Sequence, residues 1–418
     1  MEFLADIPLV VWIAGVLALY MAWAIGANDV ANAMGTSVGS GALTLSAAVV
    51  VAGVLEFSGA FFAGAHVTKT VRKGMLDVSM VPADDMMFGM LAALASAGTL
   101  LLVATRFGLP VSTTHSIVGA IVGFGAVAVD FNAVAWGKVA QIVASWVTSP
   151  LLGGVLAYFI FNLVRVTILE RDKPMDQIKK IGPFFFFYVF FIIGLVTLFK
   201  GLKHLGLDFS FLQALGLSTL LGLMAAGAGA WFLHHVHVED VDDSDFHFRS
   251  LERVFVVLQI LTACAVAFAH GSNDVANSIG PLAAVVGIAK TGAVEAKAPV
   301  EAWMLAVGGL GICFGLATWG YRVMETVGKK ITELTPSRGF AAELAAATTI
   351  VLASRLGIPV STTHILVGAV FGVGLARGIG ALDLRVVGSI LISWVATLPI
   401  SAVLSVIFFY TFKALLSP

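Results

Sequence analysis

Hydrophobic residues occupy long, nearly unbroken runs along this chain, and polar residues gather in short segments between them. A helix that crosses the hydrocarbon core of a bilayer needs about 20 mostly apolar residues. Twelve segments meet or approach that length: 8–27, 43–65, 86–107, 111–129, 139–166, 183–204, 211–233, 251–270, 301–320, 340–356, 360–376 and 388–413. The pattern therefore predicts an all-α polytopic membrane protein with about twelve transmembrane helices.

Two of the shorter segments, 111–129 and 360–376, each follow a proline directly. Proline interrupts a helix because it lacks the backbone N–H and clashes with the preceding turn. These two segments could therefore form broken or re-entrant helices instead of full crossings. The most polar connections are expected at 167–182, 234–250 and 321–339.

The composition strengthens the membrane interpretation. Of the 418 residues, 59% are hydrophobic and 12% are charged, and the mean hydropathy is +0.98. A soluble domain carries roughly 25% charged residues. The net charge of -1 provides no basic field for nucleic acid. The two cysteines, Cys264 and Cys313, stand far apart in apolar runs, which argues against a disulfide framework or a zinc site.

Two sequence motifs each occur twice. Residues 26–32 read GANDVAN and residues 271–277 read GSNDVAN, an offset of 245 positions. The block PVSTTH stands at 110–115 and again at 359–364, an offset of 249 positions. Because the offsets nearly agree, the two halves of the chain stay in register.

A third match, between Ser145-Trp146 and Ser393-Trp394, has an offset of 248 positions. Three matches in the same order predict a duplicated bundle. The expected division is a first repeat over 1–166, connecting helices and polar linkers over 167–250, and a second repeat over 251–418. Because seven predicted segments separate the two starts, the repeats should have opposite orientation, as in many secondary transporters.

The paired carboxylates Asp29 and Asp274 are the first candidates for function. A carboxylate at membrane depth costs several kcal/mol unless it has a partner. Together with the amides of Asn28 and Asn273, the two carboxylates offer hard oxygen ligands, which suit a small cation such as Na⁺. The alternative is that these residues cap helix ends near the membrane interface.

The PVSTTH blocks have a different chemistry. A helix that begins after a proline offers free N–H groups and the positive end of its dipole, and the hydroxyls add neutral donors. This combination predicts an anion site, although N-capping by Ser or Thr is the alternative. The blocks end on His115 and His364, which are either hydrogen-bonded structural groups or proton carriers.

Two further acids fall inside predicted membrane segments. Glu56 lies within the second segment and Glu343 opens the tenth, so either could bind an ion or line the pathway. Glu343 could instead cap its helix. The linker 234–250 is rich in His and Asp, and we interpret it as a solvated loop in preference to a metal site.

At these residues the chain resembles the inorganic phosphate transporter (PiT) family. The runs GANDVANAMG at 26–35 and GSNDVANSIGP at 271–281 are similar to its duplicated signature, and VSTTH at 111–115 and 360–364 matches its second repeated block. The resemblance implies about twelve helices and inverted repeats that enclose the substrate near the membrane midplane.

The resemblance also implies roles for individual residues. The expected cation ligands are Asn28, Asp29, Asn273 and Asp274. The expected phosphate ligands are Ser112, Thr113, Thr114, Ser361, Thr362, Thr363, Asn32 and Asn277. Glu56, Glu343, His115 and His364 are expected along the pathway or in coupling.

The function implied is import of inorganic phosphate by symport with Na⁺, in the plasma or inner membrane, with no cofactor besides the coupling ion. Symport with H⁺, transport of sulfate and a passive anion channel stay open as alternatives, as does a homo-oligomer. An intramembrane hydrolase is disfavoured because the serine and histidine are duplicated symmetrically, whereas an enzyme needs one nucleophile with one base.

Overall fold

The computed structural model describes residues 8–72, 75–198, 209–235, 244–294, 300–356 and 360–417. The described backbone is almost entirely helical, and an isolated antiparallel bridge joins Leu76 to Val134. The α-helices are α2 (Leu9–Asp29), α3 (Ala31–Gly39), α4 (Leu45–Arg72), α5 (Ala83–Arg106), α6 (Thr113–Phe124), α7 (Trp136–Val164), α8 (Pro174–Val196), α9 (Phe211–His235), α10 (Ser244–Thr291), α11 (Ala302–Trp319), α12 (Tyr321–Glu325), α13 (Pro336–Leu356), α14 (Thr362–Ala376) and α15 (Leu384–Leu416).

Nine helical segments among the described residues are long and apolar enough to cross a membrane. The helices α6 and α14 are not, because 12 and 15 residues rise only about 18 and 22 Å, against a hydrocarbon core of about 30 Å. Each begins two residues after the first residue of the apolar segment that the sequence predicted. The polytopic all-α fold is thus confirmed, with these two segments as short helices. The third predicted segment that is not among the nine is 340–356, which forms part of α13.

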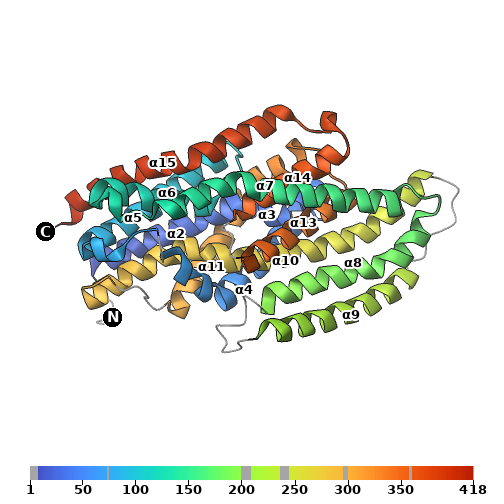
Figure 1. Cartoon of the computed structure of the whole chain (residues 1–418), viewed down its shortest axis with the longest axis horizontal. Coiled ribbons are helices and arrows are strands. Elements are labelled where there is room, and N and C mark those ends of the chain that lie inside the picture. Colours follow the sequence, from blue (N-terminus) through green and yellow to red (C-terminus); the bar gives the residue numbers. More distant parts are fainter. Residues whose placement is uncertain are drawn as a thin grey trace.

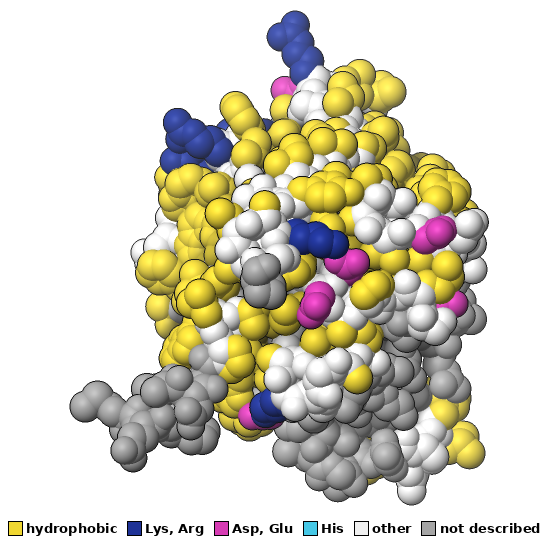
Figure 2. All heavy atoms as spheres, turned by 90° about the vertical axis from the view of Figure 1, so that its left-hand side faces the viewer, with side chains coloured by type: hydrophobic (Ala, Val, Ile, Leu, Met, Phe, Trp, Pro, Cys, Tyr) yellow, Lys and Arg dark blue, Asp and Glu magenta, His cyan; other side chains and the backbone are white. Residues whose placement is uncertain are grey.

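The outer surface of the bundle is apolar. Large hydrophobic side chains on α7, α9 and α15 point outward, and Leu212, Ile392 and Trp231 are 75, 72 and 67% exposed. Figure 2 shows one end of the bundle, where hydrophobic side chains are widespread on the described surface and charged ones are scattered. Such a surface would aggregate in water, so it is suited to contact with lipid.

The two halves interlock as equivalent pairs. Helix α2 packs on α11 and α4 packs on α10; likewise α6 packs on α15 and α7 on α14. Each pair joins one helix from each half, so neither half forms a separate bundle. Figure 1 shows α2 and α10 running in opposite directions along the long axis, as expected for inverted repeats, and α8 and α9 lying side by side at the periphery.

The signature glycines allow this close packing. A Cβ at Gly26 would collide with the Ile312 carbonyl oxygen of α11, and a Cβ at Gly271 would collide with the Glu56 carbonyl oxygen of α4. Both obstacles are backbone atoms, which cannot rotate away. The glycine that opens each signature is therefore required where α2 and α10 cross the helices of the opposite half.

We expect Gly26→Ala and Gly271→Ala each to lower the free energy of unfolding by about 1–3 kcal/mol, the usual cost of overpacking. Gly15→Ala in α2 is the matched control, because a Cβ there meets nothing within 4 Å and Ala favours a helix over Gly. Melting of the purified protein in detergent would measure all three. Equal melting temperatures for Gly26→Ala and Gly15→Ala would contradict the close contact.

The helices differ from the predicted segments at the two signatures. The predicted segments ended at 27 and 270, whereas α2 continues to Asp29, where α3 follows after Val30, and α10 continues to Thr291. The polar linker predicted at 234–250 is shorter in the structure, because α9 extends to His235 and α10 begins at Ser244. Residues 236–243 of that linker lie outside the described residues.

Candidate functional site

The first turns of α6 and α14 are built alike. The hydroxyl oxygens of Ser112 and Ser361 accept hydrogen bonds from the backbone N–H groups of His115 and His364, at 3.2 and 3.3 Å. Both serines are therefore N-caps, as the alternative interpretation expected, and each keeps its hydroxyl hydrogen for another acceptor. The first N–H groups of a helix have no intrahelical partner, so each helix start still offers donors for an anion.

The aspartate of the first half reaches the helix start of the second half. Asp29 Oδ1 accepts hydrogen bonds from Asn32 Nδ2 at 3.0 Å and from Thr363 Oγ1 at 2.9 Å. Asn32 Nδ2 also donates to Thr363 Oγ1 at 2.9 Å. All three side chains are buried. We call Asp29, Asn32 and Thr363 the Asp29 set.

The second half makes the reciprocal arrangement. Asn277 Nδ2 lies 3.2 Å from Asp274 Oδ1 and 3.3 and 3.4 Å from the hydroxyl oxygens of Thr113 and Thr114. We call these residues the Asp274 set. In both sets the aspartate and asparagine come from one half and the threonine from the other, so each set exists only in the folded, interlocked bundle.

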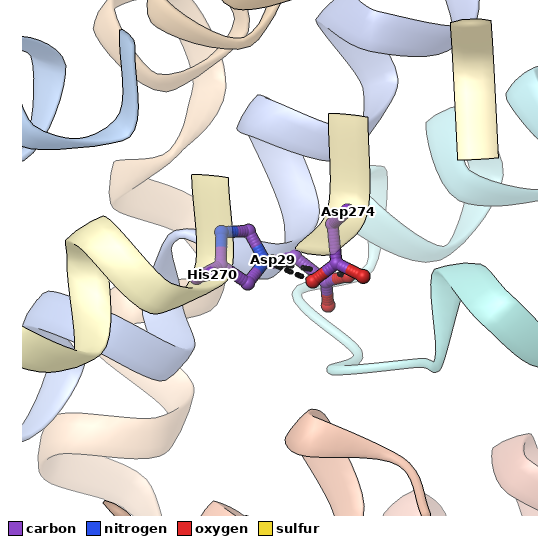
Figure 3. Close-up of side chains that lie close together, drawn as sticks. All are labelled: Asp29, His270 and Asp274. Atoms are coloured by element: carbon purple, nitrogen blue, oxygen red, sulfur yellow. Dashed lines mark ion pairs between the residues drawn. The ribbon is translucent and has the colours of Figure 1, made fainter. Parts of the chain in front are cut away.

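His270 joins the two sets. Its Nε2 lies 2.8 Å from Asp274 Oδ2 and 3.8 Å from Asp29 Oδ2, and its Nδ1 lies 2.8 Å from Glu56 Oε2. Figure 3 shows the imidazole beside both aspartates. An imidazolium would neutralise only one of the three buried carboxylates, so the site favours a further cation.

One ligand atom each from Asp29, His270 and Asp274 lies within 4.8 Å of the others. Carboxylate oxygens suit Na⁺, Mg²⁺ and Ca²⁺, whereas an imidazole nitrogen is a ligand for transition metals. The two carboxylates with the neighbouring Asn and Thr oxygens therefore fit a hard cation best.

His270 is not among the residues that the sequence predicts for the site. Its place in the first half, at the same offset of 245 positions, is taken by Ile25, so a search for duplicated residues could not find it. The available signal was its spacing: His270 stands four residues before Asp274, which puts both side chains on one face of a helix. Glu56, predicted on the pathway, is buried against this histidine.

The two signature asparagines Asn28 and Asn273 lie in different surroundings. Asn28 is fully engaged with the turn before α6: its Nδ2 donates to Leu109 O at 3.0 Å, and its Oδ1 accepts from Val111 N at 3.1 Å. Asn273 is half-buried and donates to the adjacent Asp274 Oδ1 at 3.3 Å. The repeat is therefore symmetric in sequence but not in hydrogen bonding.

Glu343 forms a separate polar cluster. It lies seven residues after the first residue of α13, so the interpretation of Glu343 as a helix cap is wrong. Its Oε1 accepts from the hydroxyls of Thr36 and Ser37, and its Oε2 accepts from Thr262 at 2.6 Å. This fully buried carboxylate with three hydroxyl oxygens around it could hold a second cation.

His115 and His364 meet where α6 and α14 begin. Their ring centroids lie 4.8 Å apart in an edge-to-face arrangement, and the Trp394 ring stacks on His364 at 3.8 Å. Thr362, the first residue of α14, precedes His364 by two residues and is half-buried. The structure thus brings the two VSTTH blocks together, as the inverted repeat predicts.

Interlocked inverted halves with a polar centre shared between them are an architecture found in many membrane transporters. The sequence matches the phosphate transporter family over residues 25–405. The chain therefore belongs to the phosphate transporter family. The resemblance seen in the sequence is confirmed. The prediction of a transporter, and not an enzyme, is also confirmed. The protein is an integral membrane protein, consistent with a place in the plasma membrane.

Sequence similarity to known proteins extends over nearly the whole chain. A putative phosphate permease of Pyrococcus abyssi is 48% identical, covering 94% of this chain and 96% of its own. The chloroplastic inorganic phosphate transporter 2-1 of Arabidopsis thaliana is 43% identical, covering 95% of this chain and 71% of its own. A solved structure described as the sodium-dependent phosphate transporter is 41% identical, with a TM-score of 0.87 and coverage of 97% of this chain and all of that one.

Proposed function

We propose that this chain imports inorganic phosphate by symport with Na⁺. Membership of the phosphate transporter family supports phosphate as the substrate. The similar structure described as sodium-dependent supports Na⁺ as the coupling ion. The observation that carries the proposal is the crossed arrangement of the Asp29 and Asp274 sets, which joins candidate cation ligands to candidate anion donors.

In this proposal, phosphate binds between the first turns of α6 and α14. Ser112, Thr113, Thr114 and the equivalent Ser361, Thr362 and Thr363 supply hydroxyl donors, and Asn32 and Asn277 supply amide donors. Free N–H groups at the two helix starts complete the site. A phosphate has more acceptor lone pairs than one helix end can satisfy, so donors from both halves are needed.

Na⁺ ions bind at Asp29 and Asp274, with the oxygens of Asn28 and Asn273 nearby and Glu56 and Glu343 along the pathway. The contacts suggest how cation and anion are coupled. Thr363 has one hydroxyl hydrogen, which it donates to Asp29. Na⁺ on this carboxylate would replace that hydrogen bond and release the hydroxyl to donate to phosphate, while also reducing the repulsion between carboxylate and anion.

Uptake into proteoliposomes tests the coupling ion. With an inward Na⁺ gradient, we expect radiolabelled phosphate to accumulate above its external concentration. With a pH gradient and no Na⁺, we expect no accumulation beyond that of empty liposomes. Full uptake in the second condition would contradict Na⁺ coupling, and equilibration without accumulation in both would indicate a passive channel. Competition by sulfate in the same assay would test the anion.

Symport with H⁺ is the second candidate, because His270 contacts three carboxylates and an imidazole can carry a proton. The same pair of gradients separates the two mechanisms. In H⁺ symport, a pH gradient alone would drive accumulation, and His270→Gln would abolish it while leaving the fold intact.

A further inference from the structure

The turn that leads into α6 is held by two side chains from distant parts of the chain. Asn28 Nδ2 donates to Leu109 O and Asn28 Oδ1 accepts from Val111 N, at 3.0 and 3.1 Å. The indole Nε1 of Trp394 donates to Pro110 O at 2.9 Å. Three consecutive residues of this turn are thus each bonded to a buried side chain from another helix.

Both side chains are themselves fixed. Asn28 Nδ2 also donates to Thr105 Oγ1 at 2.9 Å, which ties it to the last turn of α5. The Trp394 ring stacks on His364 with an interplanar angle of 19° and a centroid distance of 3.8 Å. Since His364 directly follows Thr363, the single indole touches the first turn of α14 as well as the turn before α6.

Ser112 and the threonines after it continue directly from this turn. A proline has no N–H and cannot anchor itself through a helical hydrogen bond, so the turn depends on the side chains that surround it. Binding geometry must be held within about 0.5 Å to be effective, and residues outside the direct contacts provide that precision. A shift of the turn would move every donor at the start of α6.

We propose that Trp394 and Asn28 are positioning residues for the anion site: they hold the turn Leu109–Val111 so that the donors of α6 and α14 face one phosphate. This inference rests on the proposed function, because it takes phosphate as the ligand of those donors. In this proposal Asn28 acts on the anion site. Because Asn28 directly precedes Asp29, it also connects the anion site with the cation site.

The first half supplies a matched control. Trp146 occupies the place equivalent to Trp394, but its ring lies 6.0 Å from His115 at 51°, and its Nε1 has no acceptor within the described part of the chain. Phenylalanine at either position keeps an aromatic ring and removes the N–H. Among the described residues, this removes a hydrogen bond to Pro110 O at Trp394 and none at Trp146.

The test is the concentration dependence of phosphate uptake in Trp394→Phe and Thr105→Val, with Trp146→Phe and Thr349→Val as controls. Thr105→Val removes one of the two acceptors of Asn28 Nδ2 and leaves Asn28 itself unchanged. Within the described part of the chain, the Thr349 hydroxyl donates to Ala345 O of its own helix. We expect the first two variants to raise the KM for phosphate about 2- to 10-fold, the effect of one lost neutral hydrogen bond.

The maximal rate, and the Na⁺ dependence measured at saturating phosphate, should stay near the wild-type values, and the controls should keep the wild-type KM. A lowered melting temperature and maximal rate with an unchanged KM would overturn the proposal, since this is the effect of a structural residue. Equal rises in Trp394→Phe and Trp146→Phe would also overturn it. Should Trp394→Phe fail to fold, Thr105→Val decides alone.

Different results would overturn the positioning role and the proposed function. Absence of phosphate uptake by the wild-type protein would overturn both. Normal wild-type uptake, together with an unchanged KM in Trp394→Phe and Thr105→Val, would overturn only the positioning role.

Discussion

We expect Asp29→Asn and Asp274→Asn each to abolish Na⁺-driven phosphate uptake while the protein stays folded. Each substitution removes one charge at nearly constant volume. Loss of one partner from a buried charged site costs about 3–5 kcal/mol, which corresponds to a loss of roughly 100-fold or more in apparent Na⁺ affinity. Uptake into proteoliposomes at increasing Na⁺ concentration would measure this loss.

The control for these variants is Asp130→Asn. Asp130 is exposed at a helix start and accepts a hydrogen bond from Asn132 N, so the same chemical change should leave uptake unaltered. Melting temperatures of all three variants would show whether the fold is kept. Normal Na⁺ dependence in either Asp29→Asn or Asp274→Asn would remove that residue from the proposed cation site.

The second large effect is expected at the threonines that join the two halves. Thr113→Val and Thr363→Val should each raise the KM for phosphate at least about 10-fold, because a hydrogen bond to a charged group contributes about 1.5–3 kcal/mol. Valine keeps the branched shape of threonine and removes the hydroxyl. Phosphate uptake at saturating Na⁺ would give the KM of each variant.

Thr397→Val is the matched control, because the buried Thr397 hydroxyl donates to Ser393 O in its own helix. If Thr113 and Thr363 serve only the fold, their variants should lower the melting temperature and leave the KM unchanged. An effect in one half alone would contradict a phosphate site shared by both halves, even with phosphate as the substrate.

Much of the fold could be predicted from the sequence. Hydrophobic runs give the helices because an unpaired backbone group in lipid costs several kcal/mol, which leaves a helix as the available structure for such a run. The ends of helices were less predictable. The apolar run ends at 270, yet α10 continues to Thr291, and Gly271 within it permits close packing against α4.

The duplicated motifs also identified most residues of the candidate site. The two Asn-Asp pairs and the two STTH blocks lie together at the centre of the bundle, since equivalent places of inverted repeats meet near the axis that relates them. Residues without a counterpart in the other half could not be predicted from the duplication. His270, with Ile25 in the equivalent place, is the main example.

The sequence by itself thus determined the helices, their duplication and the residue types gathered at the centre. The tertiary structure alone decided which side chains meet: Asn32 with Thr363, His270 with Glu56, and Trp394 with Pro110. These partners are separated by 331, 214 and 284 residues. Periodicity and local motifs report only neighbours within a few turns, whereas these contacts depend on how the interlocked helices pack against one another.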